Sequence, residues 1–235
     1  MKLKFQKGNA KLSTEVLTFS LPAGWSCPGA LECKSKVKHG KVIDGPHNKF
    51  RCFATSEEAR YPSVHKARQH NYSMLKNLSS GTEMKDLIIE SLPNKDKGIV
   101  RIHASGDFFS EKYFLAWCRV AQLKKDWTFY AYTKSIRYWI YNKHLVPDNL
   151  ILTASFGGKY DALINKNGLK HSLVVFSEEE AEALGYPIDH DDSLAMTPNV
   201  NFALLLHGVQ PKGSEASRAL VELKKKGWNG YGHKS

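Results

Sequence analysis

The stretch IVRIHASGDFFSEKYFLAWCRVAQLKK, residues 99–125, decides the fold because it contains one complete strand–loop–helix unit. Residues 99–104 are mostly apolar and include β-branched side chains, which predicts a buried strand. Ser110 then precedes an apolar stripe with helical spacing, so it is the predicted N-cap of a helix that runs to about Lys125. The polar segment between strand and helix is where a site is expected in such a unit.

Similar units fill the rest of the chain. Beside 99–104, strands are predicted at 12–21, 127–132, 150–154, 172–176 and 202–206. Helices are predicted from Ser56 to about Leu78 with a break at Pro62, at 83–92, around Tyr138–Tyr141, at 161–165, after the cap Ser177, and from Ser214 to Lys226. Six strands interleaved with helices predict parallel βαβ units.

We therefore predict a single α/β domain over 1–235, built as a partial (βα)6 barrel-like parallel sheet with a cysteine-containing loop after the first strand. Its parts are the N-terminal strand and cysteine loop (1–55), helices (56–92) and repeated βα units (98–227). A flat, doubly wound sheet is the alternative, because periodicity does not distinguish the two. No low-complexity linker divides the chain.

The composition favours a soluble, basic protein. The chain has 34 Lys and Arg against 23 Asp and Glu, a net charge of +11, which predicts attraction to a polyanion, a phosphorylated substrate or an acidic partner. The start MKLKFQKGNAKL lacks the apolar core of a signal peptide. No apolar run approaches the roughly 20 residues that span a bilayer. We expect no membrane contact and a cytoplasmic location, where clustered cysteines bind metals or react more often than they form disulfides.

Three of the four cysteines lie in the segment 27–54. Five residues separate Cys27 from Cys33, and eighteen separate Cys33 from Cys52. Thiolates suit soft metals and iron–sulfur clusters, and three of them would leave one iron free for another ligand. Zinc with His39 or His47 as fourth ligand is a less favoured alternative, since no C-x2-C pair is present. Three reduced cysteines without a metal are the remaining alternative.

The predicted strands end in polar residues. Asp107 follows Gly106 at one end, where glycine lets the backbone approach a ligand and the carboxylate can hold an ammonium or hydroxyl group. Lys134 and His207 follow two further strands, and we predict catalytic or binding roles for all three side chains at a shared pocket. The alternatives are an N-cap for Asp107, a solvated lysine and a hydrogen-bonded structural histidine.

The loop interior is basic. Six cations lie between the second and third cysteines: Lys34, Lys36, Lys38, Lys41, Lys49 and Arg51. They form either a solvated surface loop or a contact to nucleic acid that weakens steeply with salt. The alternative to an enzyme is therefore a non-enzymatic, basic module that binds nucleic acid or a host protein.

Motifs over nearly the whole chain resemble the bacteriophage gene product 88 family. The most distinctive are SGDF (105–108) and YTKS (132–135). The others are GNAKL (8–12), TFSLPAG (18–24), CPGALEC (27–33), RCFA (51–54), EARYP (58–62), LTASFGG (152–158), LLLHGVQPKGSEAS (204–217) and GWNGYG (227–232). The resemblance implies a phage-encoded protein in the host cytoplasm.

That family is distantly similar to radical S-adenosylmethionine enzymes, which have a partial barrel and a three-cysteine loop after the first strand. The resemblance implies a 4Fe-4S cluster on Cys27, Cys33 and Cys52, and S-adenosylmethionine held at Ser105-Gly106-Asp107. Ser155 would line the same pocket, and the substrate would be a nucleotide or nucleic acid. The cysteine spacing is longer than the compact radical-enzyme motif, and Val37 stands where a closely spaced third cysteine is expected.

Overall fold

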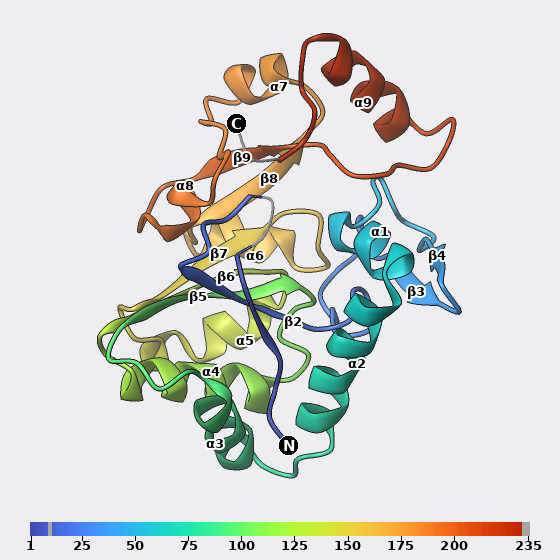
Figure 1. The fold of residues 1–235 in the computed structure, drawn as a ribbon. Coiled ribbons are helices and arrows are strands. Elements are labelled where there is room, and N and C mark those ends of the chain that lie inside the picture. Colours follow the sequence, from blue (N-terminus) through green and yellow to red (C-terminus); the bar gives the residue numbers. More distant parts are fainter. Residues whose placement is uncertain (9–10, 232–235) are drawn as a thin grey trace.

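Seven strands form the central sheet of the computed structural model, which describes residues 1–8 and 11–231 (Figure 1). In sheet order they are β1 (Phe5–Lys7), β2 (Val16–Ser20), β5 (Gly98–Ser105), β6 (Trp127–Thr133), β7 (Leu150–Ser155), β8 (His171–Val175) and β9 (Phe202–Leu205). Every neighbouring pair is parallel except β1 and β2. The predicted mostly parallel α/β sheet is confirmed.

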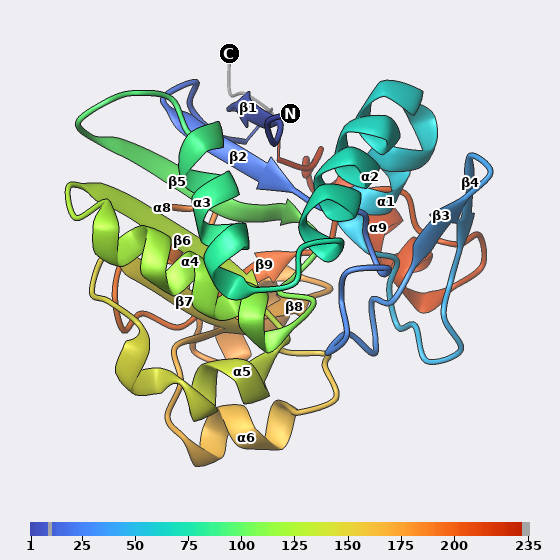
Figure 2. The same cartoon turned by 90° about the horizontal axis from the view of Figure 1, so that it is seen from below.

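From β2 to β9 the strands lie in the order in which they occur along the chain. Because parallel crossovers are right-handed, this order brings successive connections to one face of the sheet. The helices on that face are α3 (Gly81–Ser91), α4 (Glu111–Leu123), α5 (Ile136–Tyr141) and α6 (Asp161–Lys166) (Figure 2). A doubly wound sheet would reverse its strand order at a switch point, and this sheet does not.

The sheet is open in the described part of the chain, since β1 and β9 are its two edges. The strand pairing therefore does not confirm the predicted barrel-like arrangement. The helices that follow the last parallel strands are α7 (Glu178–Ala183), α8 (Ser193–Met196) and α9 (Glu215–Lys225), and one 3-10 turn covers Lys143–Leu145.

The main core lies between the sheet and the helices α3 and α4. Trp117 and Phe114 of α4 are fully buried there, because the apolar stripe of α4 faces the sheet. Phe19 of β2 and Phe129 of β6 meet the Trp117 ring at centroid distances of 5.6 and 6.1 Å. Burying large aromatic side chains removes much apolar surface from water, so this layer is a principal source of stability.

The predicted helix caps are confirmed. The hydroxyls of Ser110, Ser177 and Ser214 accept hydrogen bonds from the backbone N–H three residues later, at the starts of α4, α7 and α9. Strand and helix ranges agree with the predictions to within a few residues, except that the first predicted strand, 12–21, shortens to β2. The sequence did not predict β1 or α8.

The helices after the cysteine segment are α1 (Phe53–Arg60) and α2 (Pro62–Lys76). The break at Pro62 is confirmed, since proline occupies the first position of α2. The start at Ser56 was wrong by three residues. Buried Glu58 of α1 accepts a hydrogen bond from the Ala23 N–H at 3.1 Å, which ties this helix to the end of β2.

The segment between β2 and α1 is more ordered than its glycines and prolines predicted. It contains a two-stranded antiparallel hairpin, β3 (Lys36–Lys38) and β4 (Lys41–Ile43). His39 and Gly40 form its tip with φ of 50° and 71°. In Figure 2 the hairpin, α1 and α2 lie on the side toward which the β2 and β5 arrowheads point. The cysteine segment is thus placed at the carboxyl end of the sheet.

Candidate functional site

A cavity of about 500 Å³ opens at this carboxyl end. All nine residues that the sequence proposed as a site contribute to its lining: Cys27, Cys33, Cys52, Ser105, Gly106, Asp107, Lys134, Ser155 and His207. They come from the cysteine segment and from the ends of β5, β6, β7 and β9. Residues up to 180 positions apart in the chain therefore share one cavity, as parallel topology predicts.

The first part of the cysteine segment packs directly onto two strand–helix loops. A Cβ on Gly29 would lie 2.0 Å from the Lys134 carbonyl oxygen, so only glycine permits this approach. The Gly29 carbonyl accepts from the Lys159 N–H at 2.9 Å, and the Gly157 carbonyl accepts from the Glu32 N–H at 2.9 Å. These contacts position Cys27 and Cys33, which flank them.

Cys52 is positioned from the other side of the hairpin, as the N-cap of α1. Its N–H lies 3.4 Å from the Ser35 hydroxyl, which itself donates to Asp44 at 2.9 Å. Arg51 donates to the same carboxylate through Nε at 2.9 Å and also through its Nη2. Asp44 therefore joins both legs of the hairpin and holds Cys52 close to the segment that carries Cys33.

The three thiols are free and partly buried. Burial raises the pKa of Cys27 and Cys33 above their ordinary value, and raises that of Cys52 to about 12. The negative charges of Cys33 and Cys52 would each raise the pKa of Cys27 further, as expected of neighbouring groups. A cation bound among the thiols would remove this penalty, because it stabilises thiolates.

Within residues 1–8 and 11–231, no three His, Cys, Asp or Glu side chains are arranged to hold a single metal ion. His39 and His47, the suggested zinc ligands, are exposed and do not contribute to the cavity lining. A four-iron cluster is larger than one ion, so its thiolates lie farther apart than the ligands of a zinc ion. Cys27, Cys33 and Cys52 all contribute to the lining of one cavity.

Asp107 joins the ends of β5 and β6. One carboxylate oxygen accepts from the Phe108 N–H and the Thr133 hydroxyl, both at 2.7 Å, and the other accepts from the Lys134 N–H at 2.9 Å. Ser110, not Asp107, caps α4. Burial raises the Asp107 pKa. These three donors occupy three of the about four acceptor positions of a carboxylate.

Lys134 is a buried clamp rather than a solvated lysine. Its ammonium donates to the Ser155 hydroxyl at 2.7 Å, to the Ser155 carbonyl at 3.2 Å and to the Phe156 carbonyl. The three ammonium protons therefore have acceptors in the loop after β7. Lys134 contributes positive charge near the cysteines, and this charge lowers the pKa of Cys33 against the dominant effect of burial.

His207 follows β9 and contributes to the cavity lining. Its Nδ1 lies 3.0 Å from the Leu205 carbonyl, which only accepts, so Nδ1 carries the proton and Nε2 is the acceptor. The ring stacks on Phe53 at 3.6 Å and meets the edge of Tyr231 at 4.6 Å. Burial lowers its pKa to about 4, which keeps the imidazole neutral near pH 7.

The sequence did not reveal a buried polar cluster on the inner face of the sheet, which is the face turned away from α4. Arg101 in the middle of β5 pairs with Asp192 at 2.7 Å, and Lys11 pairs with the same carboxylate at 2.6 Å. The hydroxyls of Tyr130 and Tyr132 also donate to Asp192, each at 3.1 Å. The detectable signal was a charged residue, Arg101, inside an otherwise apolar strand.

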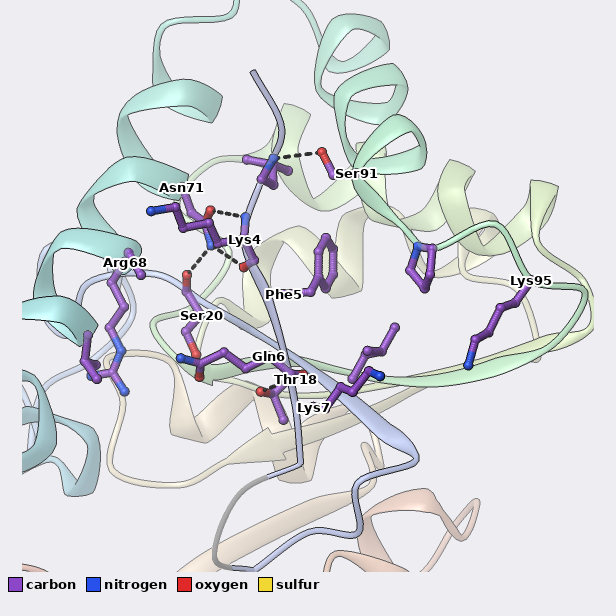
Figure 3. Close-up of a pocket in the computed structure, with 15 residues that line it drawn as sticks. Lys4, Phe5, Gln6, Lys7, Thr18, Ser20, Arg68, Asn71, Ser91 and Lys95 are labelled. Atoms are coloured by element: carbon purple, nitrogen blue, oxygen red, sulfur yellow. Dashed lines mark hydrogen bonds between the residues drawn. The ribbon is translucent and has the colours of Figure 1, made fainter.

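A second cavity of about 600 Å³ lies between β1, β2 and α2 (Figure 3). It shares Gln6, Thr18, Ser20 and Arg68 with the first cavity, so the two adjoin. Its charged lining residues are all basic: Lys4, Lys7, Arg68 and Lys95. Asn71 holds β1 against α2, because its side chain accepts from the Lys4 N–H at 2.7 Å and donates to the Lys4 carbonyl at 2.9 Å.

The family model described as "Gene product 88" matches residues 2–224. The chain belongs to the gene product 88 family. Among curated proteins, the Gene 88 protein of Mycobacterium phage L5 is 29% identical over 144 residues, which cover 57% of this chain and 54% of the relative. The Gene 88 protein of Mycobacterium phage D29 is 29% identical over 126 residues, which cover 50% and 47%.

The chain thus spans about half the length of these phage relatives. No solved structure matches it. In the described residues, no helix combines the length and the apolar character needed to cross a membrane. The family match confirms the resemblance drawn from SGDF and YTKS, and it assigns no reaction.

Proposed function

We propose that this chain is a phage-encoded, iron–sulfur-dependent enzyme of the radical S-adenosylmethionine type, acting on a nucleotide or nucleic acid in the host cytoplasm. One observation carries the proposal: three free cysteines and the segment after β5 contribute to one cavity at the carboxyl end of a parallel sheet. The consecutive strand order, which a partial barrel also requires, supports it.

Cys27, Cys33 and Cys52 would hold a 4Fe-4S cluster, with the fourth iron left for the cosubstrate. The cluster would supply one electron for reductive cleavage of S-adenosylmethionine. Asp107 would accept a hydrogen bond from the cosubstrate amine through its remaining acceptor position. Ser105 is only 3% exposed, and its hydroxyl has no hydrogen-bond partner in the described chain. This hydroxyl would bind the same group.

Gly106 lets this strand end pack closely against Ser26. Its φ is 90°, and a Cβ there would lie 2.6 Å from the Ser26 hydroxyl oxygen, so glycine is required by both conformation and space. Lys134 would hold the loop that carries Ser155 against the cavity. Neutral His207, with Nε2 as acceptor, would take or return a proton on the substrate.

Replacing Ser105 with alanine is expected to weaken S-adenosylmethionine binding about 5- to 10-fold, the value of one hydrogen bond. The protein should keep its stability, because the hydroxyl has no partner to lose. Isothermal titration of anaerobically reconstituted protein measures the affinity.

Ser172→Ala is the matched control, since its hydroxyl is also buried and unpartnered but does not contribute to the cavity lining. Equal affinity of the Ser105→Ala and wild-type proteins would refute the role of Ser105. Absence of any S-adenosylmethionine binding by iron-loaded wild-type protein would refute the proposed enzyme class.

A second candidate function is a non-enzymatic module that binds nucleic acid or a host protein. The cavity whose charged lining is entirely basic favours nucleic acid over a protein partner (Figure 3). Lys4, Lys7 and Lys95 are exposed and form no ion pair among the described residues. Such lysines would contact phosphates, with counterion release as the driving force.

The Lys4→Gln, Lys7→Gln, Lys95→Gln triple variant should then lower the slope of log affinity against log salt by about 2 for single-stranded DNA. Fluorescence anisotropy of a labelled oligonucleotide measures it. A matched variant replaces the hairpin lysines Lys36, Lys38 and Lys41. If only the hairpin variant lowers the salt slope, the DNA contact is assigned to the hairpin. Wild-type protein that does not bind DNA, or binds it independently of salt, would exclude this function.

A further inference from the structure

Arg101 and Ser105 of β5 both contribute to the lining of the cysteine cavity, and each has a buried polar atom without a partner in the described chain. These atoms are Nε of Arg101 and Oγ of Ser105. Buried polar atoms are nearly always hydrogen-bonded, so an unpartnered one beside a cavity points to a ligand. The Ser105 hydroxyl is proposed above to bind the cosubstrate, and Arg101 lies four residues deeper along the strand.

Arg101 and Ser105 are four residues apart, so the alternation of side chains along a strand puts both on one face, and β5 is irregular between them. Thr18 pairs with Arg101 while Ser20 pairs with Ser105, so β5 contains two more residues than β2 over this interval. His103 takes up the excess with a φ of 66°. Its ring packs against Phe108 and donates to or accepts from the Tyr113 hydroxyl at 3.0 Å, on the helix side of the sheet. Bulges of this kind re-aim side chains at functional sites.

The Arg101 guanidinium is fixed before any ligand binds. One terminal nitrogen pairs with Asp192 at 2.7 Å, and the group lies 5.1 Å from the centre of the Tyr132 ring. Its side chain remains 17% exposed. Its Nε has no partner in the described chain, and a guanidinium edge can donate to a planar acceptor.

The charged groups around this part of the cavity are Arg101 and Lys11 on one side of the balance and Asp192 and Asp189 on the other. Arg101 and Lys11 share the carboxylate of Asp192. The nearby carboxylate of Asp189 instead accepts backbone N–H groups of Asp191 and Ala195, at 3.2 and 3.3 Å. Phosphate and carboxylate groups are the oxyanions that a guanidinium edge binds best.

We propose that Arg101 is the specificity residue for an oxyanion, the phosphate of a nucleotide substrate, bound deeper in the cavity than the cosubstrate. The inference rests on the proposed function for the identity of the substrate, but not for the existence of the oxyanion site. The cosubstrate also carries an oxyanion, its carboxylate. The experiment must therefore separate these two sources.

The test follows the arginine Nε–H resonances of the full chain by nitrogen–proton NMR during titration with adenosine monophosphate. Arg101→Lys keeps a cation opposite Asp192 and removes the Nε–H. The resonance that is missing from the spectrum of this variant is therefore assigned to Arg101. In wild type we expect a saturable shift of that resonance. Arg101→Lys should bind adenosine monophosphate about tenfold more weakly, which is the lower value for the loss of a charge-assisted hydrogen bond. Arg119→Lys, on the exposed side of α4, is the control with unchanged affinity.

Repeating the titration with saturating S-adenosylmethionine identifies the source of the oxyanion. Unchanged nucleotide affinity supports a separate substrate phosphate. Mutual displacement, together with weaker S-adenosylmethionine binding by Arg101→Lys, would assign Arg101 to the cosubstrate and overturn the proposal. Equal nucleotide affinity of Arg101→Lys and wild type would also overturn it. The nucleotide titration needs no iron, so its failure is distinguishable from failure of the cluster proposal.

Discussion

Replacing Asp192 with asparagine is expected to lower the free energy of unfolding by about 3–5 kcal/mol, the cost of removing one partner from a buried ion pair. The Asp192 carboxylate is fully buried and accepts from Arg101, Lys11, Tyr130 and Tyr132. Without its charge, two cations on the inner face of the sheet lose their counterion. Urea denaturation, with the slope checked for constancy, measures the change.

The substitution isolates charge from backbone conformation. Asp192 has a φ of 67°, a left-handed conformation that asparagine adopts as readily as aspartate. Asp126→Asn, at an exposed turn, is the control and should change stability by less than about 0.5 kcal/mol. A loss below about 1 kcal/mol for Asp192→Asn, within the range of surface ion pairs, would contradict the account of this cluster.

The same carboxylate predicts an acid-sensitive stability. Burial acts to raise the Asp192 pKa, but Arg101 and Lys11 hold it below its ordinary value of 3.8. A carboxylate with a lowered native pKa stabilises the fold fully above the ordinary pKa, and this stabilisation is lost as the pH falls through the native pKa. As the pH falls below 3.8, Asp192→Asn should therefore lose less stability than wild type.

Replacing any one of Cys27, Cys33 and Cys52 with serine is expected to reduce the iron bound after anaerobic reconstitution from about four per chain to background. A hydroxyl is a harder and less acidic ligand than a thiol, so it does not substitute for a thiolate on a cluster. Colorimetric iron and sulfide assays on gel-filtered protein measure the content.

Cys118→Ala is the matched control for these variants. Cys118 is buried in the apolar stripe of α4 and contributes nothing to the cavity lining. Iron content of this variant should equal that of wild type even though its stability falls slightly. A wild-type iron content in Cys27→Ser, Cys33→Ser or Cys52→Ser would remove that residue from the ligand set.

Much of the fold was predictable because patterns among neighbouring residues determine where its strands and helices form. The apolar stripe of α4 and the caps Ser110, Ser177 and Ser214 specify helices from neighbouring residues alone. β1 was not predictable, because FQK is three residues long and forms a strand only through pairing with β2. The β3–β4 hairpin depends likewise on tertiary contacts, such as Asp44 with Ser35 and Arg51.

The site divides in the same way. Strand-end residues such as Asp107 and Lys134 were found because parallel topology brings strand ends together whatever the details of packing. Asp192 was not found, because α8 reaches the inner face of the sheet through a connection that has no local pattern. Arg101 was visible as a charge in an apolar strand, but its meaning required the position of Asp192.

The central claim is that Cys27, Cys33 and Cys52 together bind an iron–sulfur cluster at the carboxyl end of the sheet. The most direct measurement is the iron and sulfide content of wild-type protein purified without oxygen and reconstituted, compared with the triple cysteine-to-serine variant. The account predicts brown wild-type protein with about four iron and four sulfide per chain and a colourless variant. Wild-type protein that remains colourless and iron-free after reconstitution would contradict it.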